Sequence, residues 1–301
     1  MTGFYHAPVL GPETVDLLEP NGEGLYLDGT VGGGGHALLL LERCPHCRLL
    51  AVDRDPEALE AARVALAAYG ERVRFLEARF DAALRDAEVQ GEGLAGALLD
   101  LGISSHQVDR TARGFSFRPG APLDMRMSGE GTSAADLLNQ EDEAELARIF
   151  REFGEEPRAR SLAREIARRR QEAPLETSDD LVAALTRVLK RPAEHQQKAR
   201  VFQALRIAVN DELGALASAL DGIREALRAG GVLVVISYHS LEDRAVKHAF
   251  REWSRDCVCP PGFPVCTCRG RALGTTLTRK PVRAGADEVS RNPRARSALL
   301  R

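Results

Sequence analysis

Short apolar runs alternate with helical patterns along the first hundred residues of this chain. Residues 59, 62, 66 and 69, for example, are spaced as on one face of a helix. The apolar runs occupy residues 24–27, 49–52, 73–76 and 97–99. Strands that alternate with helices predict a parallel, doubly wound α/β sheet of the Rossmann type. A later apolar run at 232–236 predicts a central strand, and residues 298–300 predict an edge strand.

The regular alternation stops after Asp100. Residues 101–126 are rich in glycine, serine and proline and predict an active-site loop, whereas residues 133–190 are helical throughout. One long helix is then expected through 202–220, with Gly230 and Gly231 ending the helical stretch. We therefore predict a sheet domain in two parts, 1–108 and 209–301, with an all-helical subdomain inserted at 109–208.

A glycine loop between the first strand and the first helix is the strongest functional signal. Residues 28–36 place four consecutive glycines where the backbone can turn tightly and approach a ligand. Asp53 ends the next strand, where a carboxylate can accept hydrogen bonds from a ribose. The pattern also fits a nicotinamide dehydrogenase. Asp28 favours S-adenosyl-L-methionine instead, because a pyrophosphate would meet a like charge there while a sulfonium cation would be attracted.

Chemistry-bearing side chains follow four successive predicted strands. Asp28, Asp53 and Asp100 each end a strand, and Phe80 follows the third one. Because the carboxyl ends of parallel strands line one edge of a sheet, we expect these residues to form one site. The ring of Phe80 would cover an adenine, although such a ring is as often a core residue.

Composition indicates a globular protein of one or two domains. The chain has 301 residues, of which 44% are hydrophobic. It shows neither an apolar run long enough for a membrane span nor a secretory signal pattern at its start, so a cytoplasmic protein is expected.

The net charge of -3 conceals an uneven distribution. Residues 244–301 hold 13 Arg and Lys against 4 Asp and Glu, a balance of +9, and residues 1–243 hold 28 against 40, a balance of -12. The basic segment, with Phe250 and Trp253, is compatible with nucleic-acid contact or with a solvated surface. For the arginines of 158–170, which alternate with acidic residues, a solvated helix face is favoured.

Two cysteine groups add possibilities that the sequence leaves open. Cys257, Cys259, Cys266 and Cys268 form two Cys-any-Cys pairs that could bind zinc, form disulfides or remain reduced thiols. No metal ligand is assigned to the cofactor site. The pair Cys44 and Cys47 is interpreted as structural because it lacks a thioredoxin-like setting.

Nine segments of the chain, in order, resemble the RsmH family, also called MraW. They are HAPVL at 6–10, DGTVGGGGH at 28–36, DRDP at 53–56, LDLGISS at 99–105, RGFSFR at 113–118, LDMRM at 123–127, FQALR at 202–206, SYHSLEDR at 237–244 and NPRARS at 292–297. The resemblance implies a class I methyltransferase fold and an S-adenosyl-L-methionine-dependent enzyme. Its expected reaction is methylation of the exocyclic N4 amine of a cytidine in the decoding region of 16S ribosomal RNA. The small ribosomal subunit is then the expected partner.

The resemblance also implies individual site residues. Those that would bind the cofactor are Gly34, Gly35, His36, Asp53, Phe80, Asp100 and Gln107. Asp100 is the best placed candidate to hold the protons of the acceptor nitrogen, although the following Leu101 and Gly102 depart from the Asp/Asn-Pro-Pro-aromatic motif of many amino methyltransferases.

Nitrogen is favoured as the acceptor atom, because methylation at cytosine carbon 5 needs a cysteine nucleophile and none lies between Asp100 and Cys257. His239 and Asp243 are considered as proton carriers, with structural roles preferred. The alternatives are a methyltransferase for another RNA or a small molecule, a nicotinamide-dependent dehydrogenase and a non-catalytic RNA-binding protein.

Overall fold

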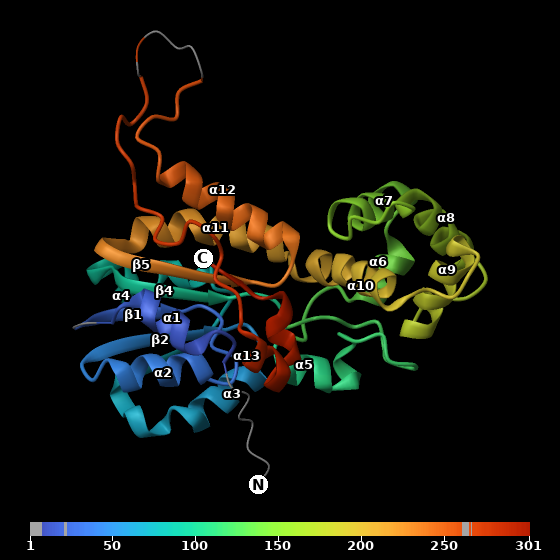
Figure 1. Ribbon diagram of the computed structural model, residues 1–301. Helices are drawn as coiled ribbons and strands as arrows, with labels where there is room; N and C mark the ends of the chain where they lie inside the picture. Colours follow the sequence, from blue (N-terminus) through green and yellow to red (C-terminus); the bar gives the residue numbers. More distant parts are fainter. Residues whose placement is uncertain (1–7, 21–22, 261–264, 266) are drawn as a thin grey trace. The chain divides into compact units, whose positions relative to one another are not determined.

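The computed structural model describes residues 8–20, 23–260, 265 and 267–301, and it divides into two compact units. Unit 1 comprises residues 1–102 and 214–301, and unit 2 comprises residues 103–213. Unit 1 contains the sheet and unit 2 is helical (Figure 1). From the sequence, these boundaries were expected between residues 108 and 109 and between residues 208 and 209.

Within its described residues, unit 1 has a six-stranded sheet in the order β3-β2-β1-β4-β5-β6. The strands are β1 Gly24–Asp28, β2 Cys47–Asp53, β3 Val73–Glu77, β4 Leu94–Asp100, β5 Leu227–Ser237 and β6 Leu299–Leu300. The first five pair in parallel, and the short β6 pairs antiparallel with the end of β5. The predicted doubly wound sheet is confirmed, and so is the edge strand near the carboxyl terminus.

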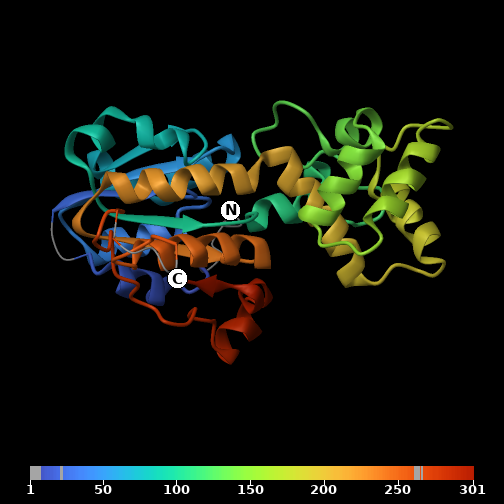
Figure 2. The same ribbon diagram turned by 90° about the horizontal axis from the view of Figure 1, so that it is seen from above.

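Both faces of this sheet are covered. Side chains alternate along each strand, so that Tyr26 belongs to one apolar cluster and its neighbours Leu25 and Leu27 belong to the other. The first cluster packs against α1 Gly11–Leu18, α2 Gly35–Arg43 and α3 Pro56–Ala65, and the second packs against α4 Ala87–Glu92, α11 Glu212–Ala226 and α12 Ser240–Trp253. In Figure 1, α11 and α12 lie above the sheet and α2 and α3 below it, and Figure 2 shows α11 running along the strands.

Helix ends in unit 1 follow local capping chemistry. Asp55 caps α3 by accepting a hydrogen bond from Glu57 N at 3.1 Å, and Pro56 occupies the first helical position, as the sequence indicated. His239 caps α12, and its side chain and that of Glu242 form a reciprocal capping box. The remaining elements of unit 1 are the 3-10 helices Ala67–Arg72, Ala82–Arg85 and Pro293–Ser297 and helix α13 Ala286–Arg291.

Two expected helix boundaries are wrong. The long helix predicted through 202–220 is two helices, α10 His195–Asn210 and α11, because Asp211 adopts a left-handed conformation with φ 48° that a continuous helix does not allow. The helical stretch also ends at Ala226 rather than at Gly230 and Gly231. Those glycines lie inside β5, where the pairing with β4 shifts register.

Unit 2 builds its own apolar core. Its helices are α5 Ser105–Asp109, the 3-10 helix Thr111–Arg113, α6 Ala134–Gln140, α7 Glu143–Glu152, α8 Ala159–Arg169, α9 Ser178–Leu189 and α10. Thr177 caps α9 in a capping box with Asp180. On α8, Arg168 and Arg169 pair with Glu165 of the same helix. These two arginines therefore have carboxylate partners within unit 2.

The segment expected to be an active-site loop contributes to this core. Phe115, Leu123 and Met125 are buried against the helices of unit 2. Asn210 fixes the loop, since its side chain donates to Met125 O at 2.7 Å and accepts from Met127 N at 2.9 Å. Apolar burial and backbone hydrogen bonds thus give this segment a defined conformation.

Gly114 provides a test of how closely the loop is packed. Its φ is +74°, and an added Cβ would clash with Pro122 O and lie 2.8 Å from Asp124 N. We expect Gly114→Ala to lower the free energy of unfolding by about 3 kcal/mol, from left-handed strain and from overpacking against backbone. Urea denaturation followed by circular dichroism measures the change.

Gly120→Ala is the matched control. Gly120 has nearly the same φ, +75°, but a Cβ there would have no neighbour within 4 Å. Its cost should be the strain alone, about 1 kcal/mol. Equal losses in the two variants would show that packing around Gly114 is not tight.

Candidate functional site

Three carboxylates lie at the carboxyl ends of neighbouring strands of unit 1. Asp28 ends β1, Asp53 ends β2 and Asp100 ends β4. Strand β1 lies between β2 and β4, and the chain reverses its order of strands between β1 and β4. In open α/β sheets this switch point is where a crevice forms and ligands bind.

Asp53 holds the glycine loop in place. Its Oδ2 accepts from Gly32 N and its Oδ1 from Asp55 N, both at 2.9 Å. Gly32 has φ +52°, a conformation that other residues rarely adopt. Burial raises the pKa of Asp53 to about 6, while the backbone N–H groups of Asp55 and Gly32 act in the opposite direction. The carboxylate therefore organises the loop.

Gly34 and Gly35 lead into helix α2. Gly34 has φ +85° and caps the helix, and an added Cβ would lie 3.4 Å from Leu66. At Gly35, a Cβ would lie 3.3 Å from two carbons of Pro8. Both positions are closely surrounded, so a larger residue would displace the loop or its neighbours.

His36 connects the loop to Asp100. It is 7% exposed, and its Nε2 lies 2.9 Å from Val9 O. Because a carbonyl oxygen only accepts, Nε2 carries the proton of this hydrogen bond. The other ring nitrogen, Nδ1, lies 3.7 Å from Asp100 Oδ2. His36 thus places a second polar atom beside the carboxylate at the switch point.

Asp100 has further partners that orient it. Tyr238, which follows β5, donates from its hydroxyl to Asp100 Oδ1 at 2.8 Å. The backbone N of Asp100 donates to Thr30 Oγ1 at 2.6 Å. Burial raises the pKa of Asp100, while His36 and the Tyr238 hydroxyl oppose the rise. Sequence reasoning missed Thr30 and Tyr238 as site residues, although Tyr238 closely follows the apolar run at 232–236.

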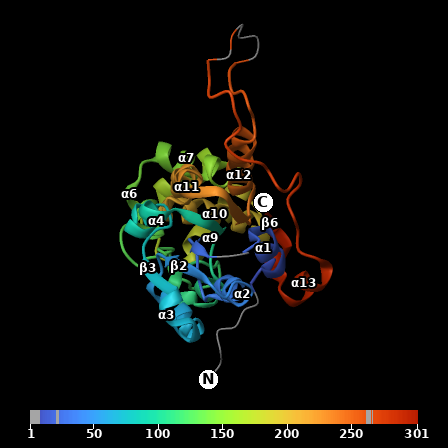
Figure 3. The same cartoon turned by 90° about the vertical axis from the view of Figure 1, so that its left-hand side faces the viewer.

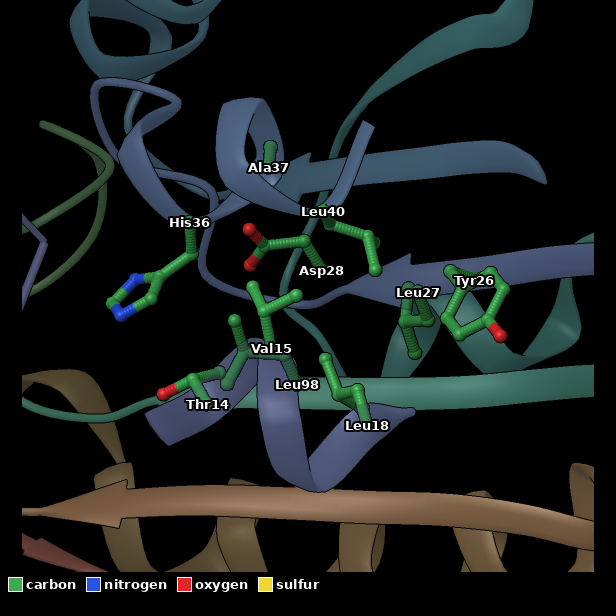
Figure 4. Close-up of a pocket in the computed structure, with 10 residues that line it drawn as sticks. All are labelled: Thr14, Val15, Leu18, Tyr26, Leu27, Asp28, His36, Ala37, Leu40 and Leu98. Atoms are coloured by element: carbon green, nitrogen blue, oxygen red, sulfur yellow. The ribbon is translucent and has the colours of Figure 1, made fainter. Parts of the chain in front are cut away.

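Asp28 is the most deeply buried of the three carboxylates. It is 2% exposed, and its Oδ1 accepts from Thr30 N at 3.1 Å. Burial raises its pKa to about 7; His36 lowers it, and the charges of Asp100 and Asp53 raise it further. A cavity of about 10 Å³ lies beside it, roughly the space for one water molecule. Figure 4 shows the carboxylate of Asp28 and the ring of His36 among the residues that line this cavity.

Two other predicted site residues lie in different settings. Phe80 follows β3 and is partly buried against the sheet, and a Cβ on Gly29 would lie 2.9 Å from the Cβ of Phe80. Gly29 thus allows Phe80 to approach the end of β1. Gln107 lies in unit 2, where its Oε1 accepts from Ser104 N at 3.0 Å and its side chain is buried.

Other polar groups have structural roles. Asp243 forms an ion pair with Arg301 at 2.8 Å, and His239 caps α12. Cys47 donates from its thiol to Cys44 O at 3.2 Å, and burial raises the pKa of this thiol to about 12. A thiol with so high a pKa is a poor nucleophile at neutral pH.

Comparison with known proteins gives the family of this chain. Residues 3–301 match the family described as MraW methylase family. The chain belongs to the MraW methylase family. It is 52% identical to the ribosomal RNA small subunit methyltransferase H of Gemmatimonas aurantiaca, over all of this chain and 95% of that protein. It is 51% identical to the protein of the same name from an Anaeromyxobacter species, over 99% of this chain and 97% of that protein.

A solved rRNA methylase from Streptococcus thermophilus is more distant. It is 10% identical, with a TM-score of 0.36, and the alignment covers 79% of this chain and 74% of that one. Because this similarity is low, the fold is assigned from the strand order of unit 1 alone. The helices of the described ranges include none that is long and apolar enough to cross a membrane.

As a member of the MraW family, the chain is an S-adenosyl-L-methionine-dependent methyltransferase. The residues at the switch point fit this cofactor. Burial raises the pKa values of Asp28 and Asp100, and the charge of Asp100 makes ionisation of Asp28 still more costly. A ligand with a sulfonium and an ammonium group would compensate these charges, whereas a pyrophosphate would add to them.

The raised pKa of Asp28 makes stability depend on pH. Between about pH 4 and pH 7 the folded protein keeps Asp28 protonated while the unfolded chain releases the proton. The free energy of unfolding should therefore fall as pH rises through this window. The difference between a pKa of about 7 and the ordinary value corresponds to roughly 4 kcal/mol. Asp28→Asn, which keeps an oxygen for Thr30 N, should remove the part of this decline that Asp28 contributes. The raised pKa values of Asp53 and Asp100 should leave a smaller decline.

Urea denaturation of the cofactor-free protein at pH 5 and pH 8 tests this expectation. Asp16→Asn is the matched control, because Asp16 is a 64% exposed carboxylate on the nearby helix α1. The control should follow the pH profile of the unaltered protein. If Asp28→Asn follows it as well, Asp28 is not a buried carboxyl group with a raised pKa.

Proposed function

We propose that this enzyme transfers a methyl group from S-adenosyl-L-methionine to the N4 amine of a cytidine in 16S ribosomal RNA of the small subunit. The observation that carries the proposal is identity of 52% over the whole chain to a relative named for small-subunit ribosomal RNA methylation. The N4 position rests on the family resemblance. A ribosomal substrate also makes the cytoplasm the proposed location.

The adenosine part of the cofactor is assigned to the ends of β2 and β3 and to the loop before α2. Asp53 would bind the ribose hydroxyls, and Phe80 would lie beside the adenine. Gly34 and Gly35 allow the backbone to approach the ligand, because neither position carries a side chain in its closely packed surroundings.

The methionine part is assigned to the ends of β1 and β4. S-adenosyl-L-methionine supplies a methyl group made electrophilic by its sulfonium. Asp28 and Asp100 would provide negative charge near this cationic part, which offsets the cost of burying both carboxylates. His36, which lies beside Asp100, and Gln107 complete the set implied by the family.

Asp100 is the proposed group on the acceptor side. The N4 lone pair of cytosine is delocalised into the ring, so a carboxylate that accepts hydrogen bonds from the amine favours a pyramidal, more nucleophilic nitrogen. The raised pKa of Asp100 suits it to take up a proton that the nitrogen must lose. Tyr238 holds Oδ1 at 2.8 Å and so fixes the orientation of the carboxylate. The main contribution of the site is alignment of donor and acceptor away from water.

The proposed ribose contact leads to a prediction on cofactor affinity. Asp53→Ala should weaken binding of S-adenosyl-L-methionine by about 1.5 to 3 kcal/mol or more, since it removes charged hydrogen bonds and two contacts that order the loop. Isothermal titration calorimetry measures the affinity. Glu60→Ala, which removes an exposed carboxylate from α3, should bind as the unaltered protein does. Unchanged affinity in Asp53→Ala would contradict the ribose role.

The reaction itself is tested with labelled cofactor. Small ribosomal subunits from cells lacking the enzyme are incubated with the protein and S-adenosyl-L-methionine labelled in the methyl group, and nucleosides are then analysed. N4-methylcytidine at one position of 16S ribosomal RNA is expected. Label in another nucleoside, or label only in a small molecule, would overturn the proposed acceptor.

Asp100→Asn tests the acceptor side in this assay. It retains the size of the side chain but cannot take up a proton, so kcat should fall by about 10²- to 10⁴-fold. The rate of the unaltered enzyme should rise with pH as Asp100 ionises, because its pKa is raised and the ionised form is the acceptor. A variant with full kcat would remove Asp100 from the acceptor side.

A further inference from the structure

The segment that follows α12 has no apolar core of its own. None of the described residues from 251 to 290 is buried. Two stretches of this segment project together beyond the end of α12, as Figures 1 and 3 show in orange. A segment without buried side chains needs another source of order if it is to keep one conformation.

Hydrogen bonds join the two stretches near the end of α12. Leu273 N donates to Trp253 O at 2.7 Å, and Ala272 N donates to the side chain of Asp256 at 3.1 Å. The guanidinium of Arg269 donates to the backbone carbonyl of residue 255 at 3.2 Å. These contacts bring residues 257–259 on one stretch next to residue 268 on the other.

Three cysteines meet at this point. The sulfur atoms of Cys257, Cys259 and Cys268 all lie within 4.8 Å of one another. The Sγ atoms of Cys257 and Cys268 are 3.8 Å apart. Thiolates bound to one tetrahedral zinc ion, with Zn–S bonds of about 2.3 Å, have sulfur atoms about 3.8 Å apart. A disulfide would bring two of these atoms to about 2.0 Å.

Backbone N–H groups point at two of these sulfur atoms. Val258 N donates to Cys268 Sγ at 3.3 Å. The backbone N–H of Thr267 forms a hydrogen bond with the sulfur of Cys259. Hydrogen bonds of this kind orient the ligands of metal sites.

We propose that Cys257, Cys259 and Cys268 bind a structural zinc ion that joins the two stretches after α12. Thiolate sulfur is a soft ligand that selects zinc over magnesium or calcium. Cys266, the fourth cysteine of the sequence pattern, lies outside the described residues, so the proposed ligand set is these three thiolates. The ion takes the place of an apolar core and fixes the basic residues around it.

The test uses the full chain purified under reducing conditions without chelator. Elemental analysis should find about one zinc ion per chain. The double variant Cys257→Ser/Cys268→Ser should lose at least nine-tenths of this zinc, whereas Cys44→Ala, a change at a buried cysteine of the sheet unit, should keep it. Far-ultraviolet circular dichroism of the double variant should match that of the unaltered protein, because none of the proposed ligands is buried in a core.

A second measurement addresses the role of the ion. After removal of zinc with a chelator, trypsin should cleave after the exposed Arg255 and Arg271 at least tenfold faster, and added Zn²⁺ but not Mg²⁺ should restore protection. Two results would overturn the proposal. One is a protein that, when purified without reductant, contains no metal and has an intact mass lower by two hydrogens, which indicates a disulfide. The other is a protein with reduced cysteines that takes up no zinc when Zn²⁺ is supplied.

Discussion

The site of this enzyme depends on one physical constraint: an ionised carboxylate in surroundings of low dielectric costs free energy unless a positive charge compensates it. Asp28 is almost completely buried, and Asp100 and Asp53 are close enough to make its ionisation more costly. Their raised pKa values express the free energy that an uncompensated buried charge costs. A cationic ligand would supply the compensating charge, which is the physical basis for the proposed binding of a sulfonium cofactor at the end of β1.

The sheet determines where such groups can lie. Helices cover both of its faces, so the strands are apolar along most of their length, and polar side chains are confined to the strand ends. The same arrangement brings together residues that are far apart in sequence. Tyr238 lies 138 residues after Asp100, and yet its hydroxyl donates directly to that carboxylate. Gly29 also lets residues that are distant in sequence approach each other, because the absence of a side chain leaves room for Phe80.

Outside the sheet, order comes from different interactions. In unit 2, one buried amide, Asn210, holds two backbone positions of a long loop, and the apolar residues of that loop complete the core. In residues 251–290, burial is absent among the described positions, and hydrogen bonds together with clustered cysteines join the two stretches. Burial of apolar area and satisfied polar groups therefore offset conformational entropy in the first two parts, and the proposed zinc ion would add a cross-link in the third.

The local pattern of the sequence determined the strands, most of the helices and the acidic residue at the ends of β1, β2 and β4. These features depend on side-chain periodicity and on caps such as Asp55, which act over a few residues. The break at Asp211 and the start of β5 at Leu227 were not predictable in this way, because tertiary packing overrides weak local preferences. Only the tertiary structure decided that Thr30, His36 and Tyr238 converge on Asp100, since their contacts span long stretches of chain and depend on the order of the strands.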